Sequence, residues 1–338
     1  MKEYRVAIAG VTGAVGTEFL RLLEERDLPL ASLRLLASSR SAGKTIRVKG
    51  TDLKVEELTA RSFEGIDIAF FSAGGSRSKE FAPAAVASGA VVIDNSSAFR
   101  MDPEVPLVVP EVNPEDALAH RGIIANPNCS TIILLMALTP LHRLSPVRRV
   151  VVSTYQAASG AGAQAMRELE EQTRAILNGE PAAKEVFPHQ IAFNLFSHNT
   201  AIDATGYNEE ERKMVNETRK ILHEPEMAIT ATCIRVPIPR AHSESINLEF
   251  SGERPSLDAA RAALAAFPGV QVVDDRETNT FPMPLDASGI NDVLVGRLRE
   301  DVSHPKALDL FVSGDQILKG AALNGFQIAE LLIERGAI

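Results

Sequence analysis

The sequence contains only two cysteines in 338 residues, Cys129 and Cys233. Two cysteines are too few for a disulfide framework in a chain of this length. The longest apolar run, at 132–138, is far shorter than the roughly 20 residues that a membrane helix requires. The amino terminus also lacks the apolar stretch of a secretory signal. We therefore expect a cytoplasmic protein that does not cross a membrane and keeps at least one thiol free.

Basic residues are fewer than acidic residues, 35 against 44, and the formal net charge is −9. This balance disfavours nonspecific binding to nucleic acid or to an anionic membrane, although a local basic cluster can still bind a small anion. The fractions of hydrophobic residues, 45%, and charged residues, 23%, are typical of globular proteins. No internal repeat or low-complexity segment is present. The length exceeds what one core usually organises, which predicts two domains.

The order of short apolar runs predicts an α/β fold. Up to about residue 130, β-branched runs alternate with helical patterns, which indicates βαβ units and a mostly parallel sheet. Longer strands follow and indicate a second domain of α+β type. The expected strands are 4–9, 33–37, 67–72, 90–94, 107–109 and 123–125 in the first part, and 148–155, 229–236, 293–300 and 307–313 in the second.

Two further segments differ from the rest of the chain in their sequence pattern. Residues 178–207 carry two prolines and little periodicity, which predicts an extended excursion. Subunit contact is one role for it, and the sequence alone does not assign its function. Residues 316–334 carry apolar side chains at helical spacing, which predicts a final helix that packs on the first domain.

A glycine-rich turn follows the first expected strand. Gly10, Gly13 and Gly16 lie in the run Gly-Val-Thr-Gly-Ala-Val-Gly, and a helical pattern comes directly after it. Such a turn lets backbone amides approach a pyrophosphate, and the helix N-terminus favours its negative charge. The spacing is GxxGxxG and not the commoner GxGxxG, and a turn that binds nothing is the alternative. The combination of strand, turn and helix favours dinucleotide binding.

The second expected strand ends without an acidic residue. An NAD-specific fold usually has Asp or Glu at this point to bind the ribose hydroxyls, whereas this chain has Ala-Ser-Ser-Arg-Ser at 37–41. Arg40 and the neighbouring hydroxyls suit a 2′-phosphate instead. They therefore predict NADP, with a solvated loop arginine as the alternative.

Cys129 stands between Asn-Pro-Asn and Ser-Thr, and an apolar run follows at 132–136. Pro127 ends one element and the apolar run begins another, so we expect Cys129 near a helix N-terminus. The helix dipole and the free amides there stabilise a thiolate, and the same amides can bind the oxyanion of a tetrahedral intermediate. A small buried side chain is the alternative for Cys129 taken alone. Cys233, inside an expected strand, is predicted to be structural.

A thiolate nucleophile needs an acid or base partner, and His242 is the best placed of the seven histidines. It follows Arg240 and Ala241 in an expected loop between two strands, and Ser-Glu-Ser comes after it. Four other histidines have ordinary surface contexts. The remaining two, His189 and His198, lie in the 178–207 segment, where the sequence does not rank them.

Three basic residues are candidate anion ligands. Arg235 lies at a strand end near His242, and its planar guanidinium suits a carboxylate, with a structural ion pair as the alternative. Arg100 follows Asp-Asn-Ser-Ser-Ala-Phe, and Lys213 lies in a helix that opens after Asn208. For each of these two taken alone, a solvated charge is the alternative.

Together these motifs resemble the aspartate-semialdehyde dehydrogenase family over essentially the whole chain. The resemblance lies in the amino-terminal glycine run, Ser-Ala-Gly-Gly-Ser at 72–76, Asp-Asn-Ser-Ser-Ala-Phe-Arg at 94–100, Asn-Pro-Asn-Cys-Ser-Thr at 126–131, Tyr-Gln-Ala-Ala-Ser-Gly-Ala-Gly at 155–162, Arg-Val-Pro at 235–237, Ala-His-Ser at 241–243, and the segment from Asp-Gln at 315–316 to Asn-Gly at 324–325.

The resemblance implies roles for individual residues. Cys129 would form the acyl-enzyme, His242 would be the acid/base catalyst, and Gln156 would position the substrate. The implied substrate ligands are Gln156, Arg235 at the carboxylate, Glu210 at the amine, and Arg100 and Lys213 at the phosphate. The implied cofactor ligands are Gly10, Thr12, Gly13, Ala14, Val15, Gly16, Arg40, Ser41, Ser159, Gly160, Gln316 and Asn324. No metal ligand is implied.

The resemblance also implies the architecture. Residues 1–128 would form an NADP-binding Rossmann domain that is completed by a C-terminal helix at 315–338. Residues 129–314 would form a catalytic and dimerisation domain. The partners implied are small molecules and further copies of the chain, in a homodimer or a homotetramer.

The implied reaction is the NADPH-dependent conversion of L-4-aspartyl phosphate to L-aspartate 4-semialdehyde and phosphate, through a thioester on Cys129, in lysine, methionine and threonine synthesis. An alternative is N-acetyl-γ-glutamyl-phosphate reductase, which shares the architecture, the thiol and the acyl phosphate. Its substrate has an acetamide in place of the free amine, so it needs no acidic partner such as Glu210. A noncatalytic dinucleotide-binding paralogue is the other alternative, and the joint presence of Cys129, Gln156, Arg235 and His242 disfavours it.

Overall fold

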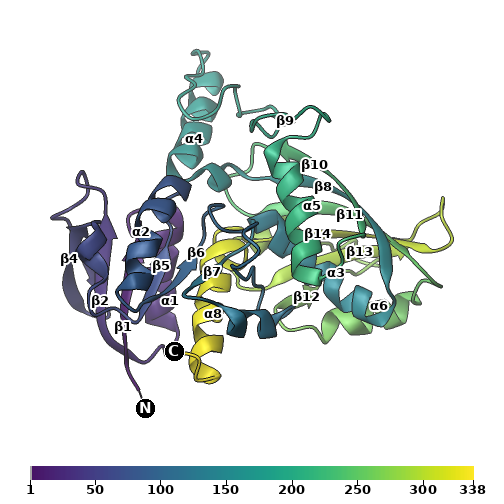
Figure 1. Ribbon diagram of the computed structural model, residues 1–338. Helices are drawn as coiled ribbons and strands as arrows, with labels where there is room; N and C mark the ends of the chain where they lie inside the picture. Colours follow the sequence, from purple (N-terminus) through teal and green to yellow (C-terminus); the bar gives the residue numbers. More distant parts are fainter. Residues whose placement is uncertain (1) are drawn as a thin grey trace. The chain divides into compact units, whose positions relative to one another are not determined.

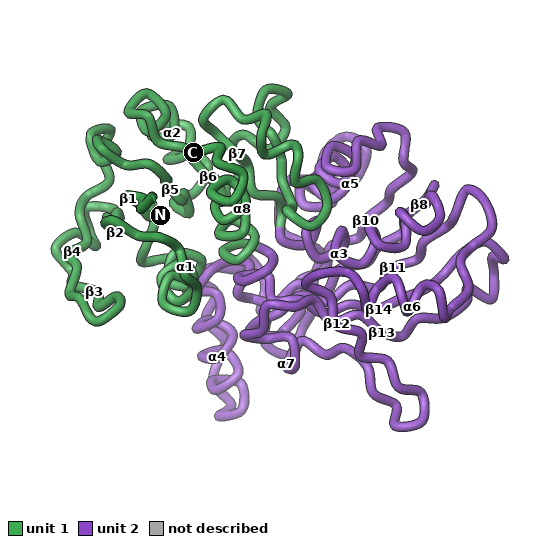
Figure 2. The backbone as a smooth tube through the Cα atoms, turned by 90° about the horizontal axis from the view of Figure 1, so that it is seen from below, with its two compact units in different colours: residues 1–128, 321–338 green, residues 129–320 purple. Residues whose placement is uncertain are grey.

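The computed structural model describes residues 2–338 and divides into two compact units (Figures 1 and 2). Unit 1 contains the chain up to Asn128 together with 321–338, and unit 2 contains Cys129–Gly320. The sequence places the return of the chain to the first domain at 315. The structure keeps 315–320 in unit 2, because Asp315 and Gln316 hydrogen-bond there to Arg240 and to the amide of Ala241.

Unit 1 is built on a seven-stranded sheet with the order β3-β4-β2-β1-β5-β6-β7, in which only the β3–β4 pair is antiparallel. Without β3, this is the doubly wound order of a dinucleotide-binding fold, and the expected α/β class is confirmed. The strands are β1 (Tyr4–Ala9), β2 (Leu30–Ala37), β3 (Thr45–Val48), β4 (Thr51–Glu57), β5 (Ile68–Phe71), β6 (Val91–Asp94) and β7 (Ile123–Ala125), and the helices are α1 (Ala14–Glu25), α2 (Gly75–Ala87) and α8 (Leu323–Glu334).

Helices cover both faces of this sheet. Phe70 of β5 stacks against Phe19 of α1 and Phe326 of α8, with ring centroids 4.5 and 6.1 Å away. The next residue, Phe71, points to the opposite face and stacks on Phe63 at 5.3 Å, in the apolar cluster that also includes Ala82 and Ala85 of α2. Alternation along one strand therefore supplies both halves of the core, as a sheet covered on both faces requires.

For unit 1, one hairpin was missed and two local expectations are wrong. The β3–β4 hairpin is absent from the sequence prediction because charged residues interrupt its apolar alternation. Its turn is nevertheless encoded, since Lys49 and Gly50 both have positive φ, 45° and 79°, as a two-residue hairpin turn requires. Residues 107–109 form only a bridge from Leu107 to Ala125. The final helix is not continuous from 316, because a π-helical turn at Leu318–Ala322 precedes α8.

Unit 2 contains a mixed seven-stranded sheet with the order β12-β13-β14-β11-β8-β10-β9. The long apolar helix α3 contacts β8, β11, β13 and β14, while α5 covers β10 and α6 covers β12 and β13. The strands are β8 (Val147–Gln156), β9 (Phe196–Ser197), β10 (Ala228–Arg235), β11 (His242–Phe250), β12 (Val270–Val272), β13 (Val293–Glu300) and β14 (Ala307–Gly314), and the helices are α3 (Cys129–Leu144), α4 (Ala163–Leu177), α5 (Glu209–Leu222), α6 (Leu257–Ala265) and α7 (Pro284–Ala287).

The described residues, 2–338, include no helix of the length and apolar character that a bilayer-spanning helix needs. The longest apolar run belongs to α3, whose side chains from Ser130 to Leu141 are all buried inside unit 2.

Candidate active site

Cys129 is the first residue of α3, as the sequence predicts. It is partly buried, whereas the turn that follows it is fully buried. Gly320 packs against it so closely that a Cβ on Gly320 would lie 2.9 Å from Cys129 Cβ. Because residue 320 is a glycine, there is space for the side chain of Cys129. The free backbone amides of the first turn of α3 also lie next to Cys129.

The strand register brings Gln156, Arg235 and His242 to one end of the unit 2 sheet. Gln156, the last residue of β8, lies opposite Arg235, the last residue of β10. His242 pairs with Gly314, and Gly160 lies against both Arg235 and His242. A Cβ on Gly160 would be 2.9 Å from Arg235 Nη1 and 3.2 Å from His242 Nε2.

The sequence places His242 in a loop, and this expectation is wrong. His242 is the first residue of β11, directly after Ala241, whose φ of 71° turns the chain into the strand. A non-glycine residue with this backbone conformation gives no recognisable signal in the sequence, because the residue type that usually marks it is glycine.

Three buried polar atoms at this end of the sheet have no hydrogen-bond partner within residues 2–338: Gln156 Oε1, Arg235 Nε and His242 Nε2. The side chains that carry them are at most 3% exposed. Buried polar groups are normally satisfied, and leaving one unpaired costs free energy. The open acceptor on Gln156 and the open donors on Arg235 and His242 indicate a site that is completed by a polar ligand with both a donor group and acceptor oxygens.

His242 is held as one neutral tautomer. The amide of Ala157 donates to its Nδ1 over 3.0 Å, and because an amide can only donate, the ring proton lies on Nε2. Complete burial, followed by the nearby positive charge of Arg235, holds the pKa of His242 well below its ordinary value. The open Nε2–H is therefore an uncharged hydrogen-bond donor.

Glu210 lies beside Gln156 at the start of α5. Gln156 Nε2 donates to Glu210 Oε1 over 3.1 Å and to Ser130 Oγ over 3.0 Å. Lys213 Nζ lies 3.1 Å from Glu210 Oε2. The helix position predicted for Lys213 is confirmed, with Asn208 as a side-chain N-cap. This network joins the residue after Cys129 to an acidic and a basic side chain.

Arg100 belongs to unit 1 and is buried, with 8% of its surface exposed. Its Nε donates to the carbonyl of Asn126 and its Nη2 to the carbonyl of Asn95, both over 2.9 Å. Asn126 comes three positions before Cys129 in the chain. The guanidinium therefore holds the segment that leads into the nucleophile.

Cys233 has the environment of a structural thiol. It is fully buried, and its Sγ lies 3.7 Å from the sulfur of Met214. Burial raises the pKa of the Cys233 thiol far above its ordinary value, so it stays protonated and unreactive.

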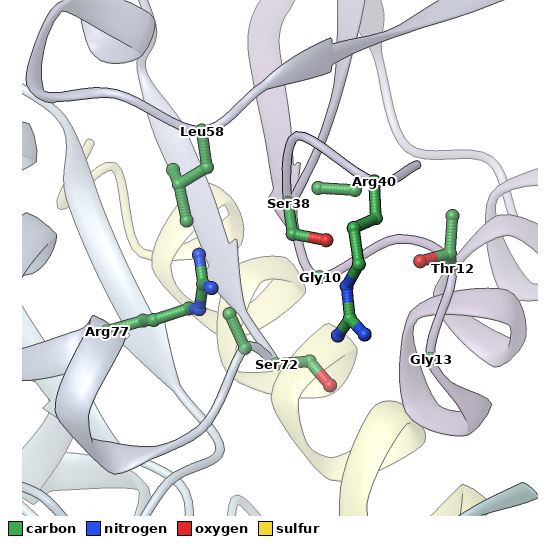
Figure 3. A pocket seen from close by; sticks show the side chains of 10 residues that line it. Gly10, Thr12, Gly13, Ser38, Arg40, Leu58, Ser72 and Arg77 are labelled. Atoms are coloured by element: carbon green, nitrogen blue, oxygen red, sulfur yellow. The ribbon is translucent and has the colours of Figure 1, made fainter. Parts of the chain in front are cut away.

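Unit 1 contains a pocket of about 220 Å³ at the ends of its central strands (Figure 3). Of the residues assigned to the cofactor, Gly10, Thr12, Gly13 and Arg40 line it. Ala14, Val15, Gly16 and Ser41 are not part of its lining. Gly16 packs below the turn instead, where a Cβ would lie 2.3 Å from the carbonyl oxygen of Gly10.

The turn before α1 is shaped for close backbone approach. Gly10 has a φ of 89°, and a Cβ there would lie 2.4 Å from the carbonyl oxygen of Ser72. Gly13 is the N-cap of α1, so no capping side chain occupies the first amides, and the first turn carries no acidic residue. Arg40 and Arg77 both extend their guanidinium groups into the pocket (Figure 3). These features fit a phosphate-bearing dinucleotide.

The other residues assigned to the cofactor have structural partners. Gln316 donates to Ser159 Oγ and accepts from the amide of Ala241 over 2.9 Å, both within unit 2. Gly160 lies against Arg235 and His242, as described above. Asn324, in unit 1, donates to the carbonyl of Val108 over 2.9 Å and to Asn126 Oδ1 over 2.6 Å. Their cofactor roles stay predictions.

Comparison with known proteins identifies the family. A domain model described as semialdehyde dehydrogenase, NAD binding domain, matches residues 5–120, and one described as semialdehyde dehydrogenase, dimerisation domain, matches 138–319. A curated aspartate-semialdehyde dehydrogenase from Synechocystis sp. is 58% identical over 98% of each chain. The chain belongs to the aspartate-semialdehyde dehydrogenase family.

Solved aspartate-semialdehyde dehydrogenases have the same fold. The enzyme II from Vibrio cholerae, complexed with ASA, superposes with a TM-score of 0.96 at 43% identity and 99% coverage of both chains. The Candida albicans enzyme with NADP superposes with a TM-score of 0.78 at 26% identity, and each chain is covered completely. The resemblance drawn from the sequence is therefore confirmed, and the chain is an oxidoreductase of amino-acid biosynthesis with an NAD(P)-binding domain.

Sequence reasoning missed two residues that the structure places next to candidate site residues. Arg77 lines the pocket beside Gly10 and Arg40, from the first turn of α2. Its signal was present, because Gly74, Gly75 and Ser76 before it form a second strand-to-helix turn in parallel with the first. His198 contacts Arg235, and no local pattern could have shown this, because the contact depends on how the 178–207 segment folds.

Proposed function

We propose that this chain converts L-4-aspartyl phosphate to L-aspartate 4-semialdehyde and phosphate, through a thioester on Cys129 and with NADPH as the reductant. The observation that carries the proposal is the group of open polar atoms on Gln156, Arg235 and His242, in a chain that also places a thiol at the start of α3. The ASA complex of the Vibrio cholerae relative supports the same substrate class.

Cys129 would attack the carbonyl carbon of the acyl phosphate as a thiolate. The new C–S bond forms, the bond from carbon to the phosphate oxygen breaks, and phosphate leaves with the bonding electrons. Arg100 and Lys213 would stabilise the charge of the phosphate. The amides of the first turn of α3 are suited to the oxyanion of the tetrahedral intermediate, because such donors act where negative charge develops.

When bound, NADPH supplies the hydride that reduces the thioester. As the acid/base catalyst, His242 would hold its Nε2–H against the substrate oxygen of the tetrahedral species on Cys129, and it would transfer a proton only from the imidazolium form, which then returns to the neutral ring. The hydrogen bond from Ala157 to Nδ1 fixes the orientation of this ring. Because the ring is neutral and buried, its Nε2–H would stabilise the negative charge on that oxygen by a hydrogen bond at neutral pH.

The two ends of the amino acid would bind to groups of opposite charge. Arg235 suits the α-carboxylate, since its Nε is open and its guanidinium is buried. Glu210 suits the α-amine, and Gln156 lies between them with one hydrogen bond to Glu210. A buried carboxylate at this place favours a free amine over the acetamide of an N-acetyl-γ-glutamyl substrate, because an amide offers no charge to pair with it.

We also propose NADP over NAD. Arg40 and Arg77 point into the nucleotide pocket together with the hydroxyls of Ser38 and Ser72, and such a group suits a 2′-phosphate. The NADP in the Candida albicans relative supports this preference.

We further propose a cytoplasmic homodimer that acts in lysine, diaminopimelate, methionine, threonine and isoleucine synthesis. The surface that would form the dimer is one face of the unit 2 sheet. The side chains of β8 alternate between buried residues such as Val152 and Thr154 and the half-exposed or exposed residues Val151, Ser153 and Tyr155. The match to a dimerisation domain supports this surface, and the two free thiols suit a reducing compartment.

The test of the reaction is phosphate-dependent reduction of NADP by the purified protein with L-aspartate 4-semialdehyde. Without phosphate, the thioester should accumulate and give a burst of about one NADPH per site. Cys129→Ala should lose the burst and at least about 10³-fold in kcat, while Cys233→Ala should keep both. Turnover only with N-acetylglutamate semialdehyde would move the chain to the neighbouring activity, and turnover with neither aldehyde would leave a binding role.

A further inference from the structure

The path of the 178–207 segment is fixed by two polar side chains of α4. Glu168 accepts hydrogen bonds from the amides of residues 185, 186 and 187. One turn later, Gln172 accepts from the amides of 191 and 192 and donates to the carbonyl of Ala183 over 2.7 Å. Both side chains are at most 5% exposed. Such buried contacts to the backbone leave an irregular segment little freedom, although it contains almost no regular structure.

This path places aromatic side chains against Arg235. The guanidinium carbon of Arg235 lies 5.6 Å from the ring centroid of Phe187, as a cation–π contact. Phe196 packs edge-on against Phe187, with centroids 5.8 Å apart. The segment therefore forms an apolar support for the cation that we assign to the substrate carboxylate.

The same segment adds a strand beside β10. Phe196 of β9 lies opposite Arg235, and Ser197 opposite Ile234, in antiparallel register. The amide of His198 continues the pairing by donating to the carbonyl of Cys233 over 2.8 Å. Side chains two positions apart on a strand share a face, so the side chain of His198 lies diagonally next to that of Arg235. Its Nε2 is 2.9 Å from Arg235 Nη2.

The hydrogen-bond roles in this contact follow from the chemistry. A guanidinium only donates, so Nε2 of His198 must be unprotonated and the ring proton must lie on Nδ1. Nδ1 is 3.3 Å from Thr200 Oγ1, and that oxygen accepts from the amide of Glu210 over 3.4 Å. Burial, as the largest cause, lowers the pKa of His198 to about 4, so the ring stays neutral at physiological pH and does not repel Arg235.

We propose that His198 is a positioning residue that fixes the plane of the Arg235 guanidinium for the substrate carboxylate, and that the 178–207 segment serves to hold His198 and Phe187 in place. Arg235 Nη1 donates to the carbonyl of Ala157 over 2.7 Å and Nη2 to His198. These two bonds fix the orientation of the cation and leave Nε open. A bidentate carboxylate requires such a fixed plane, because both parallel hydrogen bonds depend on it.

The inference rests on the proposed role of Arg235 and is tested with three variants. His198→Ala removes the acceptor. His198→Gln offers a carbonyl oxygen at a similar reach. His189→Ala is the matched control, because His189 lies on the same segment and packs on Phe196 with centroids 5.4 Å apart. KM and kcat are measured separately for L-aspartate 4-semialdehyde, phosphate and NADP, and thermal unfolding is recorded for each variant.

His198→Ala should raise KM for the aldehyde about tenfold, the size expected for a lost hydrogen bond to a charged group. KM for phosphate and for NADP should change less than about twofold, His198→Gln should recover most of the loss, and His189→Ala should match the unsubstituted protein. With 3-aminopropanal, which lacks the carboxylate, His198→Ala should have no effect on KM, because nothing then binds to Arg235.

Other outcomes overturn the inference. An unchanged KM for the aldehyde, an equal loss with 3-aminopropanal, or the same loss in His189→Ala would show that His198 does not act through carboxylate binding. In all these cases turnover by the unsubstituted protein would leave the proposed function in place. Absence of turnover in the unsubstituted protein would reject the proposed function, and with it the inference.

Discussion

The environment of a single residue in this chain often cannot be predicted from its neighbours in the sequence. Arg40 is an example, since its loop position is compatible with full solvation, and only the pocket shows that its guanidinium enters the same hollow as that of Arg77 (Figure 3). Glu244 is a second example. It lies two positions after His242 in the sequence, and only the structure shows that its carboxyl group is buried in the core of unit 2.

Arg40→Ala should lower kcat/KM for NADP by about 10- to 100-fold, because a charge-assisted hydrogen bond to the 2′-phosphate is lost. The value for NAD should be unchanged, since NAD has no phosphate at this position. Steady-state kinetics with each cofactor provide the measurement. Arg47→Ala, at an exposed arginine of β3 outside the pocket, is the control, and equal losses for NADP and NAD in Arg40→Ala would contradict a 2′-phosphate contact.

Glu244 should make the stability of the protein depend on pH. It is completely buried, neither carboxyl oxygen has a hydrogen-bond partner among residues 2–338, and burial raises its pKa well above the ordinary value. The folded state therefore retains a proton that the unfolded chain releases. Above the unfolded pKa, stability falls by about 1.4 kcal/mol for each pH unit until the folded pKa is passed.

Glu244→Gln removes this titration, so the variant should be as stable as the parent near pH 4 and increasingly more stable toward pH 7. Urea unfolding over this pH range gives the comparison. Glu249→Gln, on the same strand, should have the opposite effect at neutral pH, because a side-chain hydrogen bond from Arg148 lowers the pKa of Glu249. Parallel stability curves for Glu244→Gln and the parent would mean that Glu244 is ionised in the fold.

At the scale of elements, the turn that follows β14 holds several segments of unit 2 together. Asp315 is fully buried, and its Oδ2 accepts from Arg240 Nε over 2.6 Å and from the amide of Gly289 over 2.7 Å. Its Oδ1 accepts from the amides of Ile317 and Leu318 over 2.9 and 3.2 Å. One carboxylate thus connects the loop before His242 with the π-helical turn that contains Gly320.

Asp315→Asn should destabilise the protein by about 3 kcal/mol, since Arg240 loses its buried counter-charge and one acceptor oxygen becomes an amide donor that faces groups which also donate. Denaturant unfolding measures the loss. Asp286→Asn, at an exposed position in α7, should change stability by less than about 0.5 kcal/mol. A loss below about 1 kcal/mol in Asp315→Asn would show that the pair contributes little beyond its hydrogen bonds.

At the scale of the whole molecule, the unit 2 sheet has one face covered by helices and one face that the monomer leaves accessible. Tyr155 on this second face is 36% exposed and its ring lies 6.2 Å from that of Phe311 on β14. An exposed sheet face with aromatic side chains favours burial against another chain. The proposed homodimer would use it.

Tyr155→Arg combined with Ser245→Arg should convert the protein from dimer to monomer, because two like charges would face their symmetry copies across the interface. Light scattering after size exclusion measures the mass. Asp52→Arg, at an exposed position of β4 in unit 1, should leave the dimer intact. A double variant that remains dimeric would place the interface on another surface, such as the exposed apolar side chains Phe193, Leu195 and Ile202.

The sequence by itself determined the parallel sheet of unit 1, the glycine turn, the place of Cys129 at the start of a helix, and the family, because these depend on local patterns and on residues close together in the chain. Only the tertiary structure decided which distant side chains meet. The strand register joins Gln156 to Arg235, and the folded 178–207 segment brings His198 to the same guanidinium. Such contacts depend on register and on buried hydrogen bonds over long separations, which no periodicity along the chain encodes.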